Sequence, residues 1–139
     1  MLQLYPAVII RELNDATASL APGLPVTLIS EQGAGLCGGA GWWRAVVAKA
    51  RAIYPATPAQ DVLDCADGSG QALAALRIGQ QLLVLDRSAP GWEAVCAIAA
   101  ERGGGVLPVR PRSLDLGQRG AARRLDAWLR RDDNKTGLG

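Results

Sequence analysis

The 139-residue chain contains no histidine and no phenylalanine, and it has only two tyrosines. Without histidine, the Ser-His-Asp and Cys-His arrangements of nucleophilic catalysis cannot form, and no metal site can have an imidazole ligand. The core must instead be built mainly from alanine, leucine and valine. The exclusion of these histidine-dependent sites is the firmest functional conclusion that the sequence allows. We predict no catalytic residue.

Cysteine is scarce, and its spacing is wrong for metal or dithiol chemistry. Cys37, Cys65 and Cys96 lie far apart, so no two of them form a C-x-x-C pair. We therefore predict no metal site and no cofactor. An odd number of cysteines in a domain of this size is typical of a reducing compartment, and we expect a cytoplasmic protein. Cys37 precedes a predicted helix, where a thiolate would be stabilised, but packing as a small apolar residue is the simpler interpretation.

Long apolar runs and targeting segments are missing as well. No run approaches the ~18 residues that a membrane-spanning helix needs. Residues 1–15 lack the basic leader and the cleavage site of a signal peptide. The net charge of +2 is too small to draw the whole molecule to nucleic acid. We therefore expect neither a membrane nor a nucleic acid as partner.

The chain does contain a regular alternation of apolar strands and helices. Residues 7–20 carry apolar side chains at helical spacing and predict a first helix. Three units of a strand followed by a helix come next, and a fourth strand precedes a fifth helix within residues 117–131. The four predicted strands cover residues 25–30, 61–66, 81–86 and 105–111.

This alternation favours an α/β fold with a buried, mostly parallel sheet. We predict a three-layer sandwich in which about five helices surround a four-stranded sheet in the order 2-1-3-4. No linker divides the chain, so we predict a single domain over residues 1–131. Residues 132–139 are predicted to form a flexible tail.

A glycine-rich segment, SEQGAGLCGGAGWW at residues 30–43, follows the first predicted strand. It contains the pattern G-x-G-x-x-G as Gly33, Gly35 and Gly38, whose backbone amides at the start of a helix could hold a phosphate. Glu31 would repel that phosphate, and the acidic residue of a dinucleotide site is only loosely supplied further along the chain. Three interpretations stay open: a dinucleotide site, a site for another anion, and a purely structural turn.

Two adjacent tryptophans, Trp42 and Trp43, end this segment. Adjacent residues cannot share one face of a helix, so we expect one ring to pack inward and the other to face solvent, a ligand or a partner. Tryptophan is enriched at interfaces, which favours core packing or contact with a protein partner over stacking on a ligand.

Polar side chains follow each predicted strand. Ligands of open parallel sheets bind beyond the carboxyl ends of the strands, so we predict that these side chains contact a ligand or partner. They are Glu31, Asp64, Asp67, Asp86, Arg87 and Arg110. Three aspartates among them could converge on Mg²⁺, but their positions also fit helix caps and turns, and we favour that interpretation.

The last predicted helix has an apolar face surrounded by arginines. Leu125, Trp128 and Leu129 share that face, and Asp126 dilutes the basic charge around it. Such a helix could bind a membrane surface or nucleic acid, or it could dock by its apolar edge and keep a solvated basic face. We favour the docked helix.

Together, these features predict a small α/β protein that binds a ligand or a partner without catalysis. A homodimer or another protein is the expected partner, and a small anion is a further candidate ligand. The competing hypothesis is an enzyme that binds a nucleotide or phosphate at the glycine-rich loop, residues 33–41. Whether the strand ends open onto a concave cavity would help to decide between them.

Overall fold

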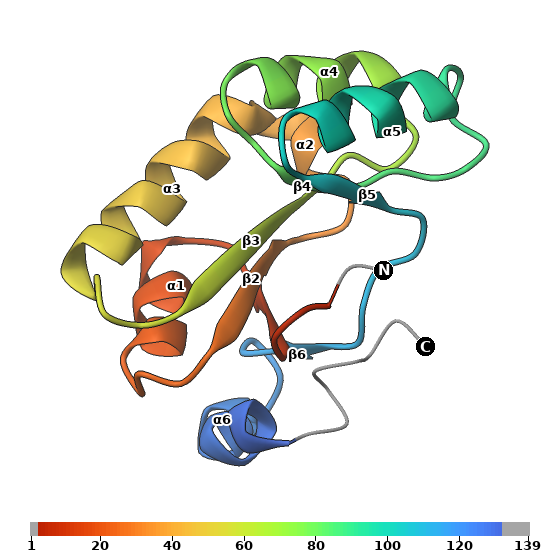
Figure 1. Cartoon of the computed structure of the whole chain (residues 1–139). Coiled ribbons are helices and arrows are strands. Elements are labelled where there is room, and N and C mark those ends of the chain that lie inside the picture. The colour runs from red at the N-terminus through yellow and green to blue at the C-terminus, as the bar shows by residue number, and fades with distance from the viewer. Residues whose placement is uncertain (1–2, 132–139) are drawn as a thin grey trace. The chain divides into compact units, whose positions relative to one another are not determined.

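The computed structural model describes residues 3–131, so the predicted tail over 132–139 lies outside the described residues (Figure 1). The fold is α/β, and its six strands form a sheet in the order β5-β4-β3-β2-β1-β6. The strands are β1 (Ala7–Ile10), β2 (Val26–Ser30), β3 (Ala59–Asp64), β4 (Leu82–Val84), β5 (Gly105–Leu107) and β6 (Ser113–Asp115). The helices are α1 (Leu13–Leu20), α2 (Ala34–Cys37), α3 (Gly39–Ile53), α4 (Ser69–Arg77), α5 (Trp92–Glu101) and α6 (Ala121–Arg130).

The chain packs into two compact units. Unit 1 comprises Met1–Ile29, Val46–Asp61 and Pro111–Gly139, and unit 2 comprises Ser30–Ala45 and Val62–Arg110. Both units are assembled from separate stretches of sequence, so no single linker divides the chain. The prediction of one domain over residues 1–131 stays a prediction.

The predicted number and order of strands are wrong. The four strands expected from the sequence correspond to β2, β3, β4 and β5, and these follow one another in chain order instead of 2-1-3-4. Two further strands, β1 and β6, complete the sheet. The predicted strand over 105–111 is shorter than expected: β5 ends at Leu107 because Pro108 has no backbone N–H to continue the ladder.

The predicted helix over residues 7–20 is a helix only in its second half. Residues 7–10 form strand β1, in which Val8 and Ile10 are fully buried. Three of its four residues are β-branched, which favours an extended backbone on a packed sheet. Helix α1 begins at Leu13. Just before it, the Arg11 N–H donates a hydrogen bond of 2.9 Å to Asp15 Oδ2, in the first turn of the helix.

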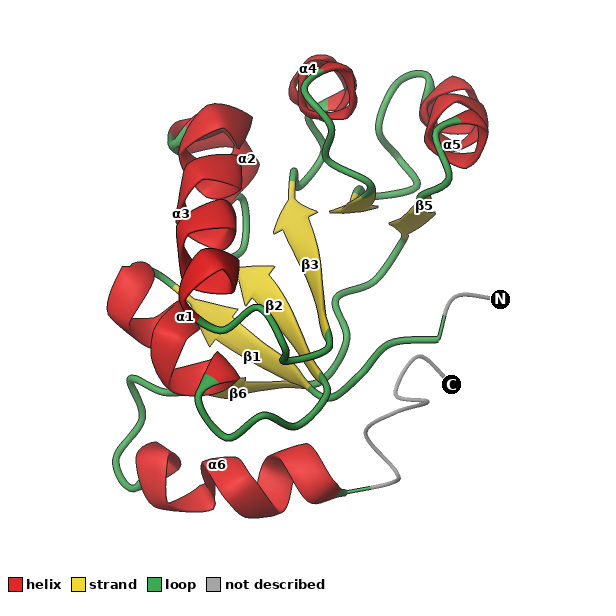
Figure 2. Cartoon of the chain, turned by 60° about the vertical axis from the view of Figure 1, so that its left-hand side comes forward, coloured by secondary structure: helices red, strands yellow, loops and turns green. Residues whose placement is uncertain are grey.

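In unit 2 the strands β3, β4 and β5 are neighbours and run parallel. Right-handed crossovers between strands that follow in chain order place their helices on the same face. Accordingly, α4 and α5 lie side by side (Figures 1 and 2). Both helices thus cover one face of these strands, and the three-layer sandwich stays a prediction.

In unit 1 the strand β1 pairs in parallel with β6, with Ala7 opposite Ser113. Helix α1 packs against β1, and α6 packs against β6 (Figure 2). As predicted, α6 docks by its apolar edge, where Leu125 and Leu129 are buried. Within residues 3–131, every helix is too short or too polar to cross a membrane.

Candidate functional site

The carboxyl ends of β3, β4 and β5 open onto a cavity of about 390 Å³ in unit 2. Parallel strands end at the same edge of a sheet, so the loops that follow them meet there. A volume of this size is sufficient for a small molecule. The cavity, called here the strand-end cavity, is lined by Gln32, Asp64, Ala66, Asp67, Val84, Asp86, Ser88, Pro108 and Arg110.

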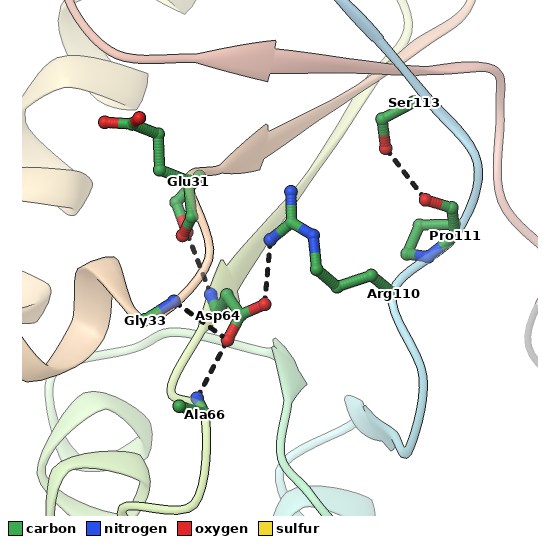
Figure 3. Close-up of polar contacts among 8 residues, drawn as sticks. Glu31, Gly33, Asp64, Ala66, Arg110, Pro111 and Ser113 are labelled. Atoms are coloured by element: carbon green, nitrogen blue, oxygen red, sulfur yellow. Dashed lines mark hydrogen bonds and ion pairs between the residues drawn. The ribbon is translucent and has the colours of Figure 1, made fainter.

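At the strand-end cavity, the Asp64 carboxylate accepts hydrogen bonds from three different loops (Figure 3). Its side chain is only 2% exposed, and Oδ2 accepts a hydrogen bond of 2.7 Å from Arg110 Nη1. Oδ1 accepts hydrogen bonds from the backbone N–H of Ala66 at 2.8 Å and of Gly33 at 3.2 Å. A buried carboxylate needs such partners to remain charged. Asp64 therefore ties the loops after β2, β3 and β5 to one another.

The backbone around Asp64 is fixed as well. Ala66 has a φ of 50°, in the left-handed region that residues with a Cβ rarely adopt. Its N–H donates to Asp64, and its carbonyl oxygen accepts a hydrogen bond of 2.8 Å from the Asp86 N–H. A strained backbone held by several bonds at a cavity is a feature of sites that must keep a fixed shape.

Asp86 is arranged to stay ionised. Its Oδ1 accepts hydrogen bonds from the Ser88 N–H at 2.8 Å and from the Ser88 hydroxyl at 2.7 Å. These bonds lower the pKa of Asp86 below its ordinary value of 3.8. A carboxyl group of this kind carries its negative charge at neutral pH and is a poor proton donor there. The two hydrogen bonds from Ser88 show that Asp86 caps its own turn. It does not cap α5, whose N-cap is Gly91.

The lining gives the strand-end cavity a negative field. Arg110 compensates the charge of Asp64 through their ion pair, and the carboxylates of Asp67 and Asp86 are exposed at the same cavity. Gln32 and Ser88 add neutral hydrogen-bonding groups. The arrangement suits a ligand that presents positive charge or N–H donors to the two aspartates.

Four of the predicted site residues come together at this cavity, and the others lie elsewhere. Asp64, Asp67, Asp86 and Arg110 all line it. Glu31 and Arg87 are exposed and do not line it. Figure 3 shows the Glu31 side chain pointing away from the Asp64 carboxylate.

The glycine-rich segment forms α2 and the first turns of α3, and its three motif glycines do not line the strand-end cavity. The N–H of Gly33 is already engaged by Asp64. A Cβ on Gly35 would lie 2.9 Å from Cys65 Sγ and 3.1 Å from the Asp64 carbonyl oxygen, so this glycine allows α2 to pack closely on the end of β3. The Gly38 N–H bonds to the Ala34 carbonyl. These contacts favour the structural interpretation, and anion binding here stays a prediction.

As expected, one of the two adjacent tryptophans is buried and the other is exposed. Trp43 is fully buried, whereas Trp42 is 39% exposed, and neither ring lines the strand-end cavity. A role of Trp42 in contacting a partner stays a prediction.

Two features of the cavity are not predicted by the sequence. No sequence pattern marks Gln32 as a site residue, and none predicts the ion pair between Asp64 and Arg110. The one signal in the sequence for this ion pair is that Asp64 and Arg110, which carry opposite charges, both lie at the ends of predicted strands. Among residues 3–131, no three or more cysteine, aspartate or glutamate side chains are grouped so that they could hold a metal ion.

Cys65 lies at the end of β3 and is fully buried. Burial, and secondarily the negative charge of Asp64, raise the pKa of Cys65 from 9.0 to about 12. A thiol with this pKa keeps its proton at neutral pH, so Cys65 is not a nucleophile next to the cavity.

The buried Cys65 thiol leads us to expect a loss of stability at alkaline pH. Between pH 9 and pH 12 the unfolded chain ionises at Cys65 while the folded protein keeps the proton. Unfolding then releases a proton, and the free energy of unfolding falls by up to about 1.4 kcal/mol per pH unit from this group. Urea denaturation below and above pH 9 should show a smaller decrease for Cys65→Ala than for the wild type. Equal decreases in the two proteins would contradict the shifted pKa.

Comparison with known proteins assigns the chain to no family, because no family model matches it and no curated protein is significantly similar to it.

Proposed function

We propose that the protein is a binding module that holds a small amine-bearing molecule in the strand-end cavity and does not convert it chemically. The observation that carries the proposal is the convergence of Gln32, Asp67, Asp86 and Arg110, from four different loops, on one cavity. Convergent polar groups in a concave site at the end of a parallel sheet are the usual form of a ligand site.

The charges select the class of ligand. Asp67 and Asp86 present carboxylates that favour a protonated amine, with charge-assisted hydrogen bonds. Arg110 is held by Asp64 at one nitrogen, and its side chain is 23% exposed, which allows it to meet a carbonyl or carboxylate on the same ligand. A phosphate placed here would approach two negative side chains, which counts against the nucleotide-binding enzyme as a function of this cavity.

The chemistry of the lining supports binding without catalysis. The chain has no imidazole, the Cys65 thiol is protonated at neutral pH, and the lowered pKa of Asp86 makes it an ineffective general acid or base near neutrality. The hydrogen bonds around Asp64 fix the loops before a ligand arrives, so little ordering entropy is lost on binding.

A titration with matched pairs of compounds tests this proposal. Putrescine is compared with butanediol and glucosamine with glucose, because the members of each pair differ chiefly in their amino groups. We expect the amines to shift the backbone amide signals of Asp67, Asp86 and Ser88 in NMR spectra, while the neutral compounds and AMP do not.

Variants of the two aspartates make the test specific. Asp67→Asn and Asp86→Asn should each weaken amine binding about fivefold to tenfold, as expected for the loss of a charged hydrogen bond. Glu101→Gln is the matched control, since it removes one negative charge from an exposed residue of unit 2 that does not line the cavity. Binding of AMP without any amine binding, or equal weakening in all three variants, would refute the proposal.

A further inference from the structure

The charges that line the strand-end cavity do not balance. Three carboxylates line it, those of Asp64, Asp67 and Asp86. Arg110 is the one cation among the described residues of the lining, and its ion pair of 2.7 Å with Asp64 compensates both of these charges. Arg87, which follows Asp86 in the chain, is exposed and does not line the cavity. Two negative charges, on Asp67 and Asp86, therefore remain for a ligand to neutralise.

The Asp86 carboxylate is held by one oxygen and leaves the other available. Its Oδ1 accepts both hydrogen bonds from Ser88, of 2.8 and 2.7 Å. Within residues 3–131, its Oδ2 accepts no hydrogen bond from the protein. The donors of Ser88 are neutral, so they orient the carboxylate without cancelling its charge. A carboxylate oriented in this way can accept a charge-assisted hydrogen bond from a ligand at little cost in entropy.

Asp67 supplies the second carboxylate from a different loop, between β3 and α4. In the described part of the chain, its side chain forms no hydrogen bond and no ion pair. The turn that carries it is fixed, because the Gly68 N–H donates a hydrogen bond of 2.8 Å to the Cys65 carbonyl oxygen. Asp67 follows β3 and Asp86 follows β4, and these strands are parallel neighbours. A ligand in the cavity thus meets two carboxylates that the chain positions separately.

The rest of the lining indicates what kind of cation fits. Quaternary ammonium groups are bound chiefly by the faces of aromatic rings, and no aromatic side chain lines this cavity among the described residues. Carboxylates instead accept hydrogen bonds from N–H donors, and Gln32 and Ser88 add further polar groups. The lining therefore suits primary ammonium groups.

We propose that the ligand of the strand-end cavity is a small diamine whose two primary ammonium groups bind Asp67 and Asp86. The inference rests on the function proposed above and narrows its ligand from any amine to a dication. Each ammonium group donates to one carboxylate, and together they neutralise the two charges that Arg110 leaves uncompensated. Because both groups belong to one molecule, the second contact adds affinity without a second loss of translational freedom.

NMR titration of the full chain tests the inference, with putrescine and butylamine as the compared probes. Butylamine has the same carbon chain and one amino group fewer. The amide signals of Asp67, Asp86 and Ser88 report binding. The Kd of putrescine should be about tenfold lower than that of butylamine, as expected for one additional charge-assisted hydrogen bond. The fully N-methylated analogue of putrescine keeps both charges but has no N–H donor, and it should bind no more tightly than butylamine.

Variants of the two aspartates assign the two contacts. Asp67→Asn and Asp86→Asn should each reduce the preference for putrescine over butylamine to about twofold, the statistical advantage of a molecule with two identical amino groups. Glu101→Gln removes a negative charge from an exposed residue outside the cavity and should keep the full preference. Amide signals away from the cavity should stay in place in all three variants, which verifies the fold.

The possible failures of this inference and of the proposed function are distinguishable. Equal Kd values for putrescine and butylamine would overturn the diamine and leave an amine site standing. Tight binding of the methylated analogue, or loss of the preference in Glu101→Gln, would overturn it by showing that diffuse negative charge selects the ligand. A response to Mg²⁺ and to no amine would assign the two carboxylates to a metal ion and refute both proposals.

Discussion

Asp64→Ala is expected to lower the free energy of unfolding by about 3 kcal/mol, at the lower end of the range for breaking a buried ion pair because Arg110 is partly exposed. The substitution removes the acceptor for Arg110, Gly33 and Ala66 at once. The left-handed backbone at Ala66 then loses a bond that holds it. Equilibrium unfolding in urea measures the change, and amine binding in the strand-end cavity should be lost in the same variant.

A double-mutant cycle separates the ion pair from the backbone bonds. Arg110→Ala alone leaves Asp64 with its two backbone donors, so it should be less destabilising than Asp64→Ala. The double variant should cost clearly less than the sum of the two single variants, since it removes the unpaired guanidinium that Asp64→Ala leaves behind. Asp67→Ala is the control, and we expect it to change the stability by less than about 0.5 kcal/mol because Asp67 is exposed. Additive single effects would show that Asp64 and Arg110 are not coupled.

Gly104→Ala should destabilise the protein by about 3 kcal/mol, at the upper end of the usual cost of overpacking. A Cβ on Gly104 would lie 1.9 Å from the backbone oxygen of Gln81 and 2.6 Å from its carbonyl carbon. The same oxygen accepts a hydrogen bond of 2.9 Å from the Gly105 N–H at the start of β5. Relief of the clash would therefore separate β5 from the residue that precedes β4.

Gly41→Ala is the matched control for this change. Gly41 lies inside α3, and a Cβ there would meet nothing within 4 Å. Alanine is the better helix former, so this variant should be more stable than the wild type by about 0.5–1 kcal/mol. Thermal and urea unfolding of the two variants should give changes of opposite sign. Stabilisation by Gly104→Ala would show that β4 and β5 do not approach as closely as described.

The sequence could predict the strands that become β2 to β5, because each is an apolar run bounded by glycine or proline. It could not predict β6, whose three residues, Ser113 to Asp115, contain a single apolar side chain. The sequence does not predict strand β1, because Ile9 and Leu13 continue the helical spacing of α1 and so extend the predicted helix back to residue 7. The order of the strands depends on how the crossovers pack, and no local pattern records that.

For the strand-end cavity, the sequence could predict that four of the lining residues meet, but not how they bond. Asp64, Asp67, Asp86 and Arg110 follow different strands of one parallel sheet, and that fact alone brings them to the same edge. The pairing of Asp64 with Arg110, and the use of the Gly33 amide by the same carboxylate, are set by side-chain geometry. Likewise, the need for glycine at position 35 arises from Cys65, a neighbour that is distant in sequence.

The pairing of β1 with β6 constrains the order in which the protein can form during synthesis. Unit 2 is complete once Arg110 has left the ribosome, whereas unit 1 still lacks its last stretch, from Pro111 onward. Until Ser113 to Asp115 emerge, strand β1 has one edge without its final partner. Unit 2 can therefore finish folding first, although the ribosome makes the amino-terminal part of unit 1 before it, and the emergence of β6 becomes the step that gives β1 this partner.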